Sequence, residues 1–128
     1  MIHQLTQGIK ISVDTSYNNA FYKEHKIHYA FNYKITIENQ SNDTVQLLSR
    51  HWEITDALNF TEIVDGKGVI GFTPILKTKT KYTYNSGCLL ISPMGSMKGY
   101  YTMFNFSSNQ KFNVIIPSFK LTAPFAIN

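Results

Sequence analysis

Hydrophobic and polar residues alternate with a period of two along most of this chain. The clearest case is residues 26–38, where every second position is large and apolar or aromatic: Ile27, Tyr29, Phe31, Tyr33, Ile35 and Ile37. Successive side chains of a β-strand point to opposite faces, so this alternation predicts a strand with one buried face. The β-branched and aromatic residues in it also favour strands.

Shorter stretches repeat the pattern, and turn residues separate them. We predict further strands at 8–14, 45–55, 61–64, 77–85, 88–91, 99–107, 111–116 and 119–121. Turns are predicted at 39–43, 86–87 and 92–95, and a polar loop over 15–25. No segment keeps a helical period over the usual helix length. The pattern therefore predicts an all-β sandwich of two antiparallel sheets with about seven to nine strands, in one domain spanning 1–128.

The stretch 45–55 breaks the simple alternation. Trp52 and Leu48 have the parity of one face and Arg50 lies between them, whereas Leu47 has the parity of the other face. Two explanations are open. Either a β-bulge changes the register near residues 49–50, or Arg50 lies flat beside Trp52 with its charged head at a sheet edge.

Composition narrows the class of protein. The chain has 128 residues, a net charge of +4 and one cysteine, Cys88, which excludes an internal disulfide. The N-terminus lacks a signal-peptide pattern, and no apolar run is long enough to span a membrane. We expect a cytoplasmic protein with no membrane partner. Lysines 77, 79 and 81 are expected to protect a sheet edge, because a nucleic-acid-binding surface would be more basic and more clustered.

A glycine run occupies residues 66–71, with the sequence GKGVIG, and matches the G-x-G-x-x-G pattern. In a dinucleotide-binding fold that pattern leads from a strand into a helix. Here Val69 and Ile70 are β-branched and Pro74 follows, so we exclude that reading. Two readings remain: backbone N–H groups that converge on an anion beside Lys67, or glycines that supply a positive φ for a tight turn or bulge.

Arg50 is the only arginine, and its planar fork suits a phosphate or a carboxylate. It would equally suit a structural role, paired with Glu53 or Asp56 or packed on Trp52. If the functional reading holds, the candidate phosphate-binding residues are those of the glycine run together with this arginine: Arg50, Gly66, Lys67, Gly68 and Gly71.

The sequence offers no complete catalytic set, metal site or cofactor site. Carboxylates flank the predicted turns at Glu53, Asp56, Glu62 and Asp65, but their spacing defines no ligand geometry. His51 has no nucleophile beside it in sequence. Cys88 lies among leucines, which predicts a buried and unreactive thiol.

Four segments of the chain are distinctive: LLSRHWEITD at 47–56, VDGKGVIG at 64–71, PMGSMKGYY at 93–101 and IPSF at 116–119. Together they resemble the ApaG family over almost the whole chain. One departure stands out: the family usually has a Pro-Gly turn where this chain has Thr78-Lys79.

The resemblance implies an immunoglobulin- or fibronectin-III-like sandwich, in agreement with the pattern. It also implies a small bacterial protein linked to cobalt and magnesium tolerance. Related domains act as interaction modules in larger eukaryotic proteins, F-box proteins among them, and a pyrophosphate role has been suggested for the family's glycine run. We therefore expect a non-enzymatic binding module that engages a protein partner or a phosphate-bearing small molecule. The rival is an enzyme or sensor acting on pyrophosphate or dinucleoside polyphosphates through residues 66–71. An unpaired edge strand would permit a homodimer.

Overall fold

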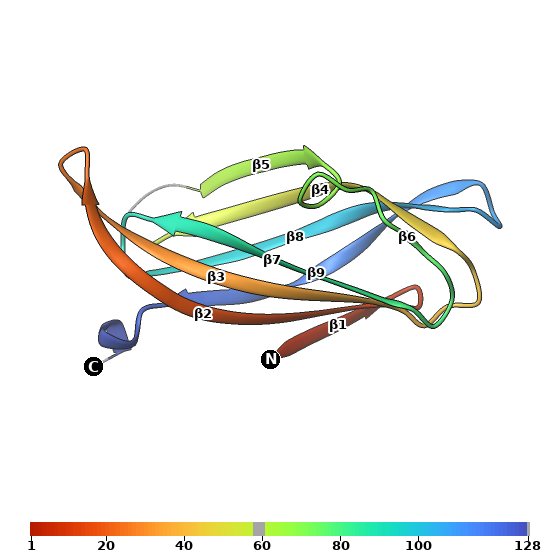
Figure 1. Cartoon of the computed structure of the whole chain (residues 1–128), viewed down its shortest axis with the longest axis horizontal. Coiled ribbons are helices and arrows are strands. Elements are labelled where there is room, and N and C mark those ends of the chain that lie inside the picture. Colours follow the sequence, from red (N-terminus) through yellow and green to blue (C-terminus); the bar gives the residue numbers. More distant parts are fainter. Residues whose placement is uncertain (58–60, 128) are drawn as a thin grey trace.

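The computed structural model describes residues 1–57 and 61–127, which form nine strands and one short 3₁₀ helix (Figure 1). The strands are β1 (Ile2–Thr6), β2 (Ile9–Lys23), β3 (Lys26–Asn39), β4 (Val45–Asp56), β5 (Thr61–Lys67), β6 (Ile75–Leu76), β7 (Lys81–Leu90), β8 (Met94–Asn105) and β9 (Gln110–Thr122). The 3₁₀ helix, η1, spans Pro124–Ile127. One sheet has the order β1-β2-β3-β7, and the other β5-β4-β8-β9 with β6 beside β4; all pairs are antiparallel. The predicted all-β sandwich is confirmed.

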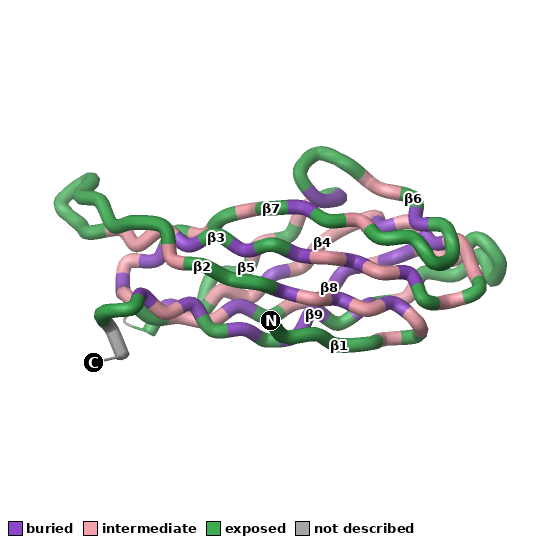
Figure 2. Tube along the Cα trace, turned by 60° about the horizontal axis from the view of Figure 1, so that its bottom comes forward, coloured by how far each residue is buried: buried purple, intermediate pink, exposed green. Residues whose placement is uncertain are grey.

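The core lies between the two sheets, where buried positions of both face each other (Figure 2). From β3, the alternating residues Phe31, Tyr33, Ile35 and Ile37 are all buried, as the pattern predicts. Ile27 was predicted on the same buried face, and this is wrong, since its side chain is 50% exposed. The tip of the β2–β3 hairpin extends beyond the opposite sheet (Figure 1), which accounts for the exposure of Ile27.

The loop predicted over residues 15–25 is instead the outer half of this hairpin. β2 continues to Lys23 and pairs with β3 up to Lys26. Glu24 and His25 form the turn, both with positive φ, as a two-residue type I′ hairpin requires. Most of these residues are exposed, so no hydrophobic alternation marks the strand. Pairing with β3 therefore decides the conformation here, rather than the local composition. β1 was not predicted either.

The predicted turn at 86–87 is also wrong. β7 runs without a break through both residues, and Gly87 pairs with Asn32 of β3. The change of direction comes earlier, at residues 77–80, where a strand was predicted. There the amide of Thr80 donates to the carbonyl of Lys77 at 3.2 Å, and Lys79 has a φ of 63°. A positive φ at the third residue of a hydrogen-bonded turn is the type II geometry, which Pro-Gly favours. The Thr78-Lys79 departure thus leaves a lysine in a left-handed conformation.

We expect Lys79→Gly to stabilise the protein by about 1 kcal/mol, because glycine adopts a positive φ without a Cβ clash. The control is Lys77→Gly, which removes a lysine from the same turn at a position without positive φ and is expected to give no gain. Urea denaturation of the three proteins measures the effect. Equal midpoints for the two variants would contradict the strain argument.

A β-bulge in β4 settles how Arg50 fits the pattern. The pairing of β4 with β8 shifts register between Leu47 and Ser49, which confirms the first of the two explanations. After the bulge, Arg50 pairs with the buried Tyr101 and so shares the inner face with Trp52. His51 consequently points outward.

Candidate functional site: an inter-sheet slot beside the glycine hairpin

Arg50 holds the beginning of the glycine run. In the β4–β5 register it lies opposite Gly66, where a Cβ would come within 2.6 Å of the guanidinium carbon. The guanidinium therefore lies against the bare backbone of Gly66. Its Nη1 donates to the carbonyls of Lys67 at 3.0 Å and of Gly68 at 2.8 Å. Arg50 makes no ion pair with a carboxylate among the described residues, so neither predicted acidic partner is used.

The rest of the glycine run is a tight hairpin. Ile70 and Gly71 both have positive φ, at 48° and 78°, and Val69 and Phe72 exchange backbone hydrogen bonds of 2.8 and 2.9 Å. This is the type I′ pattern. Gly68 also has a positive φ, and its amide donates to the carbonyl of Leu48 at 2.8 Å. Two amides of the run, those of Gly68 and Val69, are thus already hydrogen-bonded to backbone carbonyls, and backbone conformation explains Gly68 and Gly71. The use of the run as a phosphate cradle stays a prediction.

A slot of about 410 Å³ opens between the edge strands β5 and β7, next to this hairpin. Its lining comes from both sheets and comprises Tyr33, Arg50, Trp52, Ile54, Glu62, Val64, Ser86, Gly87, Cys88, Leu89 and Met97. Along the opposite long side of the sandwich, β1 lies against β9, and the amide of Ile115 donates to the Thr6 hydroxyl at 3.3 Å. A concave site that combines apolar side chains with convergent polar groups is typical of small-molecule binding.

Three strands contribute hydrogen-bond donors to the slot. Arg50 is half-buried, and its Nε and Nη2 make no hydrogen bond within the described chain. No side-chain nitrogen of the described residues is both buried and unpartnered, so these N–H groups are open to solvent. The hydroxyls of Tyr33 on β3 and Ser86 on β7 also line the slot. Burial raises the pKa of Tyr33 more than the interaction with Ser86 lowers it, which keeps Tyr33 a neutral donor.

Two buried tyrosines belong to the same electrostatic environment as Arg50. The hydroxyls of Tyr84 and Tyr101 hydrogen-bond to each other across the two sheets. Burial raises the pKa of both phenols, while the positive charge of Arg50 acts in the opposite direction. Both remain neutral near pH 7, so the charge of Arg50 is not balanced by a phenolate.

Cys88 and Glu62 lie toward the other end of the slot. Cys88 is half-buried on β7, and burial raises the pKa of its thiol to about 11, with the charges of Glu62 and Asp56 adding to the effect. The thiol is therefore protonated near neutral pH, in line with the unreactive cysteine predicted from its neighbours. Glu62 is on the exposed edge strand β5.

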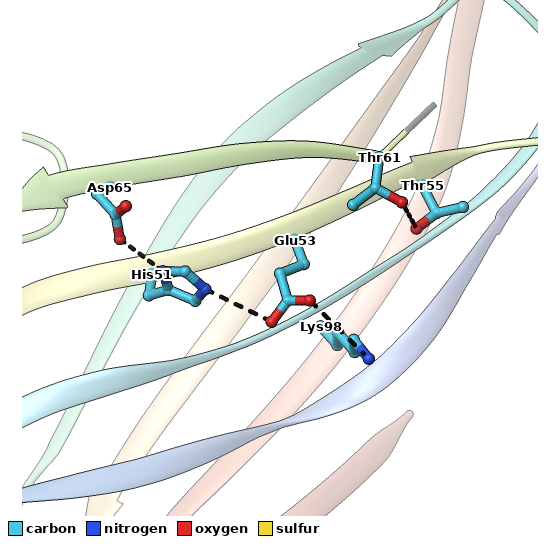
Figure 3. A network of polar contacts seen from close by, with 6 residues as sticks. All are labelled: His51, Glu53, Thr55, Thr61, Asp65 and Lys98. Atoms are coloured by element: carbon cyan, nitrogen blue, oxygen red, sulfur yellow. Dashed lines mark hydrogen bonds and ion pairs between the residues drawn. The ribbon is translucent and has the colours of Figure 1, made fainter. Parts of the chain in front are cut away.

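A separate polar network lies on the outer face of the second sheet (Figure 3). His51 Nδ1 is 2.6 Å from Asp65 Oδ1, and its Nε2 is 3.5 Å from Glu53 Oε2. Glu53 also lies 4.0 Å from Lys98, and the His51 ring stacks on Tyr100 at 4.7 Å. The hydrogen bond with Asp65 is the main cause that raises the pKa of His51. Carboxylates face both ring nitrogens, so this histidine ties β5 to β4.

The four carboxylates singled out in the sequence do not converge. Glu53 and Asp65 belong to the outer network, while Glu62 lines the slot. Asp56 is buried and accepts hydrogen bonds from the amide of Ile91, at 2.7 Å, and from the Ser92 hydroxyl. Across residues 1–57 and 61–127, no group of three or more His, Cys, Asp or Glu is placed to hold a metal ion.

The structure brings together only part of the predicted site. Arg50, Gly66, Lys67 and Gly68 lie together, and Gly71 is at the far tip of the hairpin. Tyr33, Ser86 and Glu62 were not recognised as site residues. No local signal identifies them, because the slot forms only where β5 of one sheet meets β7 of the other.

The ApaG domain family model matches residues 19–105, which is most of the chain. The chain belongs to the ApaG family. It is 41% identical over 124 residues to the ApaG protein of Mesorhizobium japonicum, covering 97% of this chain and 95% of that one. It is 42% identical over 120 residues to the ApaG protein of Vibrio cholerae, covering 94% of each chain.

This ApaG-family fold also matches a solved X-ray structure from a structural genomics programme. The TM-score is 0.87 at 40% identity, covering 91% of this chain and 88% of that one. Within the described residues, no helix has the length and apolar character that crossing a membrane requires.

Proposed function

We propose that this ApaG-family chain is a non-enzymatic binding module that holds a phosphate-bearing small molecule in the slot between β5 and β7. The observation that carries the proposal is that Arg50 lines this slot and has N–H groups that no described residue uses. The ligand is a phosphate-bearing molecule, as expected from the sequence. Its anchor is the side chain of Arg50, in place of the backbone amides of the glycine run.

The position of Arg50 suits an anion for two physical reasons. Its Nη1 is already fixed by two backbone carbonyls, so little side-chain entropy is lost when the other N–H groups bind. The adjoining floor, formed by Trp52, Ile54, Val64 and Met97, is apolar and lowers the local dielectric, which strengthens charge-assisted hydrogen bonds. The neutral hydroxyls of Tyr33 and Ser86 add further donors.

The test is a titration with phenyl phosphate and with pyrophosphate, followed by amide shifts and by Trp52 fluorescence. Trp52 is the only tryptophan and lines the slot, so its emission reports on this site. We expect shifts around Arg50, Ser86 and Gly66. Silence of the wild-type protein, or shifts confined to Ile70 and Gly71, would overturn the slot assignment.

We expect Arg50→Met to weaken phenyl phosphate binding about 10- to 100-fold, the worth of a charged hydrogen-bonding group. Lys98→Met is the matched control, because it removes a cation from the outer face of the same sheet and is expected to leave affinity unchanged. Ser86→Ala is a second variant that leaves the hydrogen bonds of Arg50 in place. We expect it to weaken phenyl phosphate binding about three- to tenfold. Equal affinity of the wild type and all three variants would place the ligand elsewhere.

A further inference from the structure

We propose that the slot selects an elongated ligand with an anionic group at one end, an apolar middle and an amine at the other end. Arg50 and Glu62 are its two anchors. The anionic end rests on the function proposed above, whereas the amine end is an independent assignment.

The register of β4 and β5 sets the distance between the anchors. Arg50 of β4 pairs with Gly66 of β5. Glu62 lies four residues before Gly66 on β5 and pairs with Ile54 of β4. Residues four apart on a strand point to the same face. At about 3.3 Å per residue, the backbone positions of the two anchors are about 13 Å apart along the strands.

The segment between the anchors is apolar. Val64 pairs with Trp52 midway between the two ends, and Met97 of β8 completes the floor. The other wall has the neutral thiol of Cys88. Polar ligand atoms placed here would lose water without gaining a charged partner, so methylene or aromatic groups fit best.

Glu62 supplies the opposite charge. Its carboxylate makes no hydrogen bond or ion pair with any other described residue, although Glu62 lines the slot. Glu62 of β5 and Cys88 of β7 line the same slot from its two edge strands. At one end is a carboxylate and at the other a guanidinium edge, neither with a partner among residues 1–57 and 61–127, and the pair is complementary to a ligand with ends of opposite charge. An inward charge on an edge strand also prevents pairing with another chain, and the experiment separates the two roles.

A length series of ligands tests the inference. Aminoalkyl phosphates with two, four, six and eight methylenes are titrated against the full chain, and alkyl phosphates of equal length provide the matched series without the amine. We expect the aminoalkyl series to pass through an affinity maximum at four or six methylenes. At that length the amine is expected to add about three- to tenfold over the alkyl phosphate.

Two variants complete the test. Glu62→Gln is expected to remove the advantage of the amine while leaving the affinity for alkyl phosphates unchanged. Glu53→Gln, on the outer face of the same sheet, is expected to retain that advantage. Phosphates that bind through Arg50 with no dependence on length or amine would overturn this inference and leave the proposed function standing. Absence of binding by every phosphate in both series would overturn both.

Discussion

Ile35→Asp is expected to leave the chain without a cooperative folded state. Ile35 is 0% exposed and lies in β3, the strand between β2 and β7. The substitution removes apolar burial worth roughly 1.5–3 kcal/mol and places a carboxylate beside the buried Val13 and Tyr84. An unpaired buried charge adds several kcal/mol. The sum approaches the whole stability of a typical domain, about 5–15 kcal/mol.

The control for this prediction is Asn32→Asp in the same strand. Asn32 is exposed on the opposite face, and the change adds a charge with almost no change in shape. It is expected to alter stability by no more than about 0.5 kcal/mol, as is usual for surface substitutions. Circular dichroism and thermal melts compare the two. A normal melting curve for Ile35→Asp would show that this face of β3 is not in the core.

The same strand shows why part of the fold was predictable. Alternation identifies β3 because one of its faces packs in the core and the other is exposed to solvent. The burial of Ile35 and Ile37 follows from this pattern. The outer half of β2 has solvent on both faces, so the same physics leaves no pattern in residues 15–23. The polar composition there indicated a loop, yet main-chain pairing with β3 does not require apolar side chains. Hydrophobic alternation therefore does not reveal strands of exposed hairpins.

The site was less predictable because its determinants are non-local. The parity of Arg50 could be explained in two ways until the bulge between Leu47 and Ser49 was seen. Gly66 is a glycine because a guanidinium from the neighbouring strand lies against it, a fact fixed by register rather than by spacing. Ser86 resembled a turn residue beside Gly87, but it is an inward residue of an edge strand. Arg50 was named from the sequence and lines the slot, whereas Tyr33 and Ser86, which also line it, were not named.

Gly68→Val is expected to cost at least about 3 kcal/mol of stability, enough to unfold a marginal domain. Gly68 has a φ of 63°, which a β-branched residue rarely adopts. A Cβ at this position would also lie 2.1 Å from the carbonyl oxygen of Phe72, which is backbone and cannot rotate away. Urea denaturation measures the loss. A change below 1 kcal/mol would mean that the hairpin rearranges at little cost, and the turn geometry would then not explain this glycine.

Gly71→Ala is the matched comparison within the same hairpin. Its φ is 78°, but no atom lies within 4 Å of a Cβ built there, so the expected cost is about 1 kcal/mol from conformation alone. The protein should stay folded, which makes this variant the cleaner probe of function. If the run cradles phosphate through its amides, Gly71→Ala should weaken binding at the hairpin tip. If Arg50 is the anchor, phenyl phosphate should bind Gly71→Ala as tightly as the wild type and bind Arg50→Met poorly. The glycines would then serve to position the arginine, and the anion would be held by the side chain that they leave room for.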